Sequence, residues 1–241
     1  MRFALQIAGY VFGLLLEFLI ISALLRNGGY KKLPFVFIYT VVDFITTVLE
    51  VPQAIPYVRG IRSATVGFAA LYWIDEIVIQ VLIYAVVMSL VYEASRQLRS
   101  RRILRVSVIA GAILIAAISF LVHHNPASNT GQWMTPWTRD LNFTSAILDL
   151  GLWALLIGSR SRDHRMLLLS GALGIKFAGE SIGESVRQLA IRSRSRPISL
   201  TGNVIILLAN MFFLFVWWQA VRAPKQSREP SARGDGSRKG R

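Results

Sequence analysis

Residues 167–189 read LLLSGALGIKFAGESIGESVRQL, and this stretch decides how many times the chain crosses a membrane. It is long enough to do so, because a hydrocarbon core of about 30 Å needs about twenty helical residues. However, it also carries Lys176, Glu180, Glu184 and Arg187, and ionisable side chains are costly in lipid. Whether this stretch crosses the membrane must therefore be judged from the sequence on either side of it.

Apolar runs of similar length occur along the whole chain. Hydrophobic residues make up 54% of the sequence and the mean hydropathy is +0.49, which is more than a soluble domain requires. We therefore predict an all-α integral membrane protein, a bundle of seven transmembrane helices. The predicted spans are 3–25, 33–51, 68–92, 104–122, 141–157, 167–189 and 198–221, followed by a disordered basic tail at 223–241.

The distribution of basic residues predicts the orientation. With seven spans and an external N-terminus, eighteen of the 27 Lys and Arg fall on the cytoplasmic side and seven outside. If residues 167–189 did not cross, the division would be fourteen against eleven. Cytoplasmic loops of membrane proteins are enriched in Lys and Arg, so seven spans fit better, although the outer loop at 192–196 is itself basic. This pattern indicates a plasma membrane protein in a lipid bilayer, and no nucleic-acid partner.

Acidic residues are concentrated inside the predicted spans. Eight of the thirteen Asp and Glu lie there, opposed by only two bases, Lys176 and Arg187. Because such carboxylates cannot face lipid, we expect them to face protein or water. The eight are Glu17, Asp43, Glu50, Asp75, Glu76, Asp149, Glu180 and Glu184.

Helical spacing groups the polar residues into stripes. In the first span, Gln6, Tyr10, Gly13 and Glu17 recur every three or four residues and so share one face. Every other span except 104–122 has a comparable stripe, so we expect that span at the lipid-facing periphery. Since neighbouring helices are antiparallel, Glu17, Asp43 and Lys176 are predicted at a similar depth. Gly179 and Gly183, four residues apart, are spaced to let another helix approach.

The excess of acids predicts a functional cavity. Eight acids and two bases cannot all form ion pairs, so several acids must be protonated or share an external cation. We therefore expect a site for a small ligand or cation, in a proton- or cation-coupled transporter or in a ligand sensor that acts on a cytoplasmic signalling partner. The candidate residues are Glu17, Asp43, Glu50, Asp75, Glu76, Gln80, Asp149, Lys176, Glu180, Glu184 and Arg187.

Two other functions stay open. The buried charges could merely hold helices together in a structural or assembly protein. An intramembrane enzyme could use Asp75 and Glu76 as acid and base, but no nucleophile accompanies them, and the chain has no cysteine. We expect no cofactor and assign no metal ligands, since His123, His124 and His164 fall in predicted loops.

Known seven-helix families do not match these residues. Microbial rhodopsins attach retinal to a lysine of the last helix, and the span at 198–221 has none. The external N-terminus and Pro52-Gln53 are similar to the three-plus-one-plus-three sugar transporters, but the first and fifth spans lack the matching prolines. The sequence therefore identifies no family.

Overall fold

The structure, a computed structural model, describes residues 2–58, 64–96, 102–124, 130–158, 164–193 and 196–222. All regular structure in these ranges is helical, which confirms the predicted seven-helix fold. The predicted tail at 223–241 lies outside the described residues. The helices are α1 (Arg2–Arg26), α2 (Pro34–Val58), α3 (Ala64–Arg96), α4 (Arg102–His123), α5 (Thr130–Gly158), α6 (His164–Ser193) and α7 (Arg196–Arg222), with a short 3-10 helix η1 (Gly29–Lys31) between α1 and α2.

The helices have the length and composition of a multi-pass membrane protein. Six of them, all except α2, contain a described stretch that is long and apolar enough to cross a membrane, and α2 contains a shorter one, Pro34–Leu49. Several helices extend past the predicted spans, since α2 continues to Val58 and α5 begins at Thr130. Apolar runs mark only the part of a helix inside the hydrocarbon, whereas backbone hydrogen bonds continue the helix into the interface.

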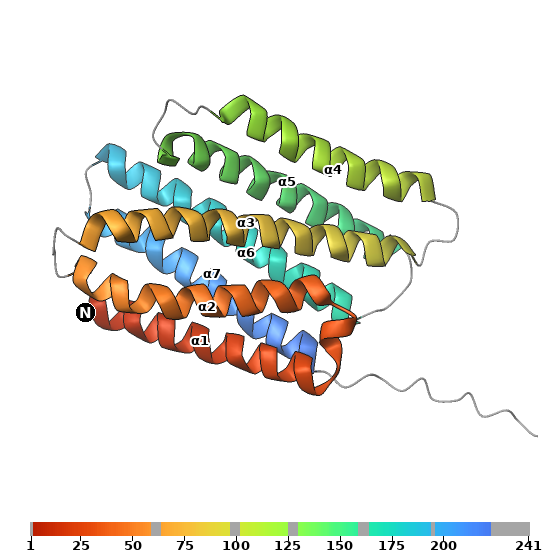
Figure 1. The fold of residues 1–241 in the computed structure, drawn as a ribbon, viewed down its shortest axis with the longest axis horizontal. Helices are drawn as coiled ribbons and strands as arrows, with labels where there is room; N and C mark the ends of the chain where they lie inside the picture. The colour runs from red at the N-terminus through yellow and green to blue at the C-terminus, as the bar shows by residue number, and fades with distance from the viewer. Residues whose placement is uncertain are drawn as a thin grey trace, which may run out of the picture.

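Six helices form a closed ring. Each packs against the next in the order α1, α2, α3, α5, α6, α7, and α7 packs against α1. The ring is flattened, because α3 also touches α6. Helix α4 lies outside at one edge, against α5 and α3 (Figure 1). The absence of a polar stripe in the fourth span had predicted this peripheral position.

A tight turn sets the antiparallel pairing of α1 and α2. Gly28 adopts a left-handed conformation with φ +60°, which glycine accepts without steric cost. The turn is held to α7 by Asn27, whose Nδ2 donates to the backbone oxygen of Val221 at 3.2 Å. We call this end of the ring the inner end, and the end where α1 begins the outer end, in keeping with the predicted orientation.

The apolar core occupies the inner half of the ring. Its fully buried members include Leu24 of α1, Val36 of α2, Leu90 of α3, Leu169 of α6 and Leu214 of α7. The outer half differs, since no described side chain at 41–49 of α2 or 75–79 of α3 is fully buried. Among the described residues, apolar side chains therefore fill the inner half of the ring, whereas these stretches of α2 and α3 are only partly buried or exposed.

Helices α6 and α7 make the closest approach, at three glycines. A Cβ added at Gly202 of α7 would lie 2.8 Å from the backbone oxygen of Gly183 in α6. A Cβ at Gly179 would clash with Ala209. The pair Gly179 and Gly183, predicted to admit a neighbouring helix, therefore faces α7.

Candidate functional site

An ion pair lies at the centre of the ring. The Nζ of Lys176 is 2.6 Å from Oε1 of Glu180, one turn later on α6, and their side chains are only 11% and 25% exposed. The second oxygen of Glu180 accepts a hydrogen bond from Nδ2 of Asn142 on α5 at 3.1 Å. Both oxygens of this carboxylate are therefore held in place.

Side chains from three further helices surround this pair. Lys176 interacts electrostatically with Asp43 of α2 and Glu76 of α3 as well as with Glu180. Asp43 interacts in turn with Asp75, and Glu17 of α1 with Asp43. The structure thus brings Glu17, Asp43 and Lys176 together, as their similar predicted depth implied. We call the following set the central polar cluster: Glu17, Asp43, Asp75, Glu76, Lys176 and Glu180.

Glu17 is the most buried member of the cluster. Its side chain is 3% exposed, and its Oε2 has no hydrogen-bond partner among the described residues. Gly13, one turn earlier on the same face, is also buried, yet a Cβ built there would meet no atom within 4 Å. Glu17 therefore has an unused acceptor among the described residues, and an unpaired buried carboxylate is costly without a proton or a cation.

Helix α3 contributes a second unpartnered group. Gln80 is 8% exposed, and its Nε2 lacks a hydrogen-bond partner in the part of the chain that the structure describes. One turn earlier, Glu76 interacts electrostatically with Lys176 and Glu180 on α6. Asp75 and Glu76 remain partly exposed.

Three aromatic side chains close the interior below the cluster. Tyr39, Phe213 and Trp217 are each at most 1% exposed, with ring centroids 4.4–6.3 Å apart. Nε1 of Trp217 donates to the backbone oxygen of Leu169 at 3.1 Å, which ties α7 to α6. We call these three residues the aromatic floor. Lys176 lies over it, with Nζ 5.5 Å from the centroid of Phe213.

Asp149 occupies a separate position between α5 and α6. It is 3% exposed and accepts a hydrogen bond on Oδ1 from Oγ of Ser170 at 2.6 Å. A Cβ added at Gly174 would lie 3.5 Å from its Oδ2, so the carboxyl group packs closely against α6. This geometry suits a buried hydrogen bond between two helices.

The remaining candidates lie toward the outer end. Glu184 and Arg187 pair with each other at 2.6 Å, with side chains 52% and 44% exposed. Glu184 also interacts electrostatically with Glu76 of α3. Glu50 belongs to α2, but its side chain lies outside the described residues.

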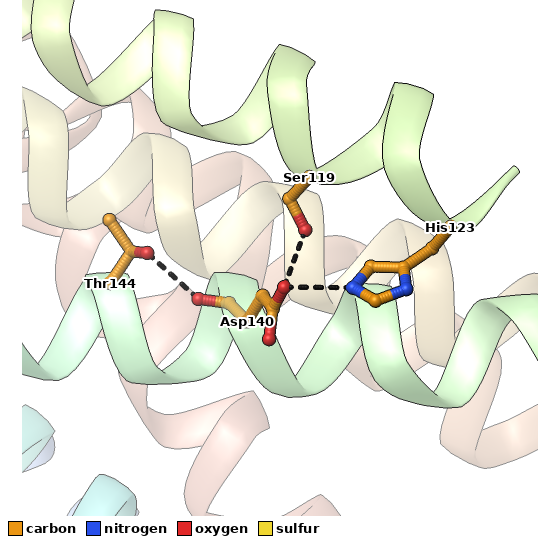
Figure 2. A network of polar contacts seen from close by, with 4 residues as sticks. All are labelled: Ser119, His123, Asp140 and Thr144. Carbon is orange, nitrogen blue, oxygen red and sulfur yellow. Dashed lines mark hydrogen bonds and ion pairs between the residues drawn. The ribbon is translucent and has the colours of Figure 1, made fainter.

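A serine, a histidine and an aspartate meet between α4 and α5, as Figure 2 shows. Oγ of Ser119 donates to Oδ2 of Asp140 at 2.8 Å, and Nε2 of His123 lies 3.0 Å from the same oxygen. In a hydrolytic triad the histidine accepts the proton of the serine, whereas here both groups bind the aspartate. The arrangement fastens α4 to α5 and does not activate Ser119. Among the described residues, no group of three His, Asp or Glu could hold a metal ion.

Sequence reasoning missed Phe213 and Trp217 of the aromatic floor and the partner of Asp149. Phe213 and Trp217 sit in an apolar span, where aromatic residues carry no signal of a cation above them. Ser170 belongs to no polar stripe that points to Asp149. Comparisons with known proteins add nothing to this geometry, since no family model, curated protein or solved structure matches the chain.

Proposed function

We propose that the central polar cluster binds a cation that enters from the outer end, and that the protein is a proton- or cation-coupled transporter. The observation that carries this proposal is the imbalance of charge in the ring. Five carboxyl groups surround one ammonium group, and Glu17 keeps a buried oxygen without a hydrogen-bond partner among the described residues. Groups of this kind inside a membrane take up protons or metal cations far more readily than they stay charged and unpaired.

The packing of the ring supports entry from the outer end. The apolar core and the aromatic floor fill the inner half, whereas the acidic side chains lie above them. We therefore place the entry of the cation on the side of the cluster away from the aromatic floor. Transport to the other side would require the aromatic floor to move, and such alternating exposure of one site is how secondary transporters work.

The test uses purified protein in liposomes with a pH-sensitive dye inside. Sodium, potassium or methylammonium chloride is added outside, and proton movement is followed. We expect saturable proton flux with at least one cation, abolished in Glu17→Gln and Asp43→Asn. Glu93→Gln, a carboxylate change at the inner end of α3, is the matched control and should keep the flux.

Two other results have distinct meanings. If a cation raises the thermal stability of the protein but drives no proton flux, the protein is a cation sensor and not a transporter. No stabilisation and no flux with any of the three cations would refute the proposal and favour a structural protein.

A further inference from the structure

The side chains around the Lys176 ammonium group form a binding site for a single positive charge. Oε1 of Glu180 contacts it at 2.6 Å, the ring of Phe213 lies 5.5 Å below, and Asp43 and Glu76 add negative charge from the opposite side of the ring. A carboxylate and an aromatic face together are how proteins bind ammonium groups. The cation that occupies this site is part of the chain itself.

We propose that Lys176 is a tethered competitor, whose ammonium group occupies the site that an external monovalent cation of ammonium size takes during the functional cycle. This inference rests on the proposed function and names its ligand class, an alkylammonium group. Lysine suits the role because its ammonium group is a compact charge on a flexible four-carbon stem. It can leave the site by rotation of the side chain alone.

The geometry around the ammonium group gives it somewhere to go. Besides Glu180, the ammonium group interacts electrostatically with Asp43 of α2 and Glu76 of α3. Below it the aromatic floor is closed. A displaced ammonium group would therefore pair with Asp43 or Glu76, while the entering cation takes its place on Glu180. The ring then carries one more positive charge than before, and the excess of carboxyl groups over ammonium groups balances it.

If an external cation displaces Lys176, removal of the lysine should strengthen cation binding instead of weakening it. If Lys176 fills the site most of the time, only the small remaining fraction of molecules binds an external cation, and the apparent Kd is weakened by that fraction. Lys176→Met removes the competitor, so affinity for the cation should rise roughly 10- to 100-fold. A lysine that only supports the local structure would give the opposite sign, because its loss would disturb the site.

The experiment measures binding of methylammonium, potassium and sodium to the detergent-solubilised full chain by isothermal titration calorimetry. We expect Lys176→Met to bind methylammonium more tightly than the wild type, while Lys176→Arg, which keeps the charge, gains nothing. If Lys176→Met does not fold, Lys176→Met/Asp43→Asn is compared with Asp43→Asn alone, and the double variant should bind more tightly.

The outcomes separate the two proposals. Binding to the wild type with equal or weaker binding to Lys176→Met overturns the tethered competitor and leaves the proposed function standing. Preference for sodium or potassium in Lys176→Met overturns the assigned ligand class. Absence of binding to every variant, with all three cations, overturns the proposed function itself.

Discussion

Replacing Gly202 with alanine tests the close approach of α6 and α7. The added methyl group would lie 2.8 Å from the backbone oxygen of Gly183 and 2.8 Å from Cγ of Arg187. The arginine side chain can move aside, but the backbone oxygen moves only if the two helices separate. Overpacking of this kind costs about 1–3 kcal/mol. Alanine also stabilises a helix by about 0.5–1 kcal/mol relative to glycine. The measured change in unfolding free energy would therefore underestimate the cost of the clash.

A matched variant removes the helix-propensity term. Gly111 lies in α4, and a Cβ added there would meet nothing within 4 Å. Gly111→Ala should therefore leave stability unchanged or slightly raised, and the difference between the two variants should be about 1–3 kcal/mol. Equilibrium unfolding in mixed detergent micelles measures both. If Gly202→Ala is as stable as Gly111→Ala, the close contact at Gly183 does not exist in the folded protein.

Three further predictions concern orientation and buried polar groups. Reporter fusions after Val221 should be active in the cytoplasm and fusions within 124–138 outside, and the reverse result would reject the orientation predicted from the basic residues. Lys176→Met should lower the free energy of unfolding by roughly 3–5 kcal/mol if the site is dry and by less if water enters. Adding Asp43→Asn should recover part of that loss. Strictly additive effects of the two changes in a double-mutant cycle would disprove the electrostatic coupling between Lys176 and Asp43. Ser170→Ala should lower the free energy of unfolding by about 1–3 kcal/mol, because Asp149 loses its buried hydrogen-bond donor. In the same unfolding assay, Ser170→Ala/Asp149→Leu should be more stable than Ser170→Ala.

The sequence predicted the helices and their polar faces because each leaves a local pattern, whereas the grouping of Glu76 with Lys176 needed the structure. Runs of about twenty apolar residues mark membrane-spanning segments, and the spacing of Gln6, Tyr10, Gly13 and Glu17 marks an inner face. The plain apolar span at 104–122 likewise predicted that α4 lies outside the ring. These features depend only on residues within one helix.

What the sequence could not predict depends on contacts between helices. The hydrogen bond from Ser170 to Asp149 joins residues of α6 and α5 that are not linked by any periodic pattern. Phe213 looks like any other apolar residue of α7, although it lies under the Lys176 ammonium group. The exposure of Glu184 and Arg187 also follows from how α6 is rotated in the ring, which their spacing on α6 leaves undetermined.

The external position of α4 leaves it with less contact to protein than any other candidate span among the described residues. Its apolar stretch, Val106–His123, spans 18 residues, or about 27 Å at 1.5 Å per residue, close to the thickness of a typical hydrocarbon core. Only 11% of this stretch is buried in the protein. Polar contacts fasten α4 to the ring at two levels, from the hydroxyl of Tyr84 to the backbone oxygen of Ala112 and from Ser119 and His123 to Asp140. Longer or shorter lipid chains would therefore change the tilt of α4 before they deform the ring that holds the central polar cluster.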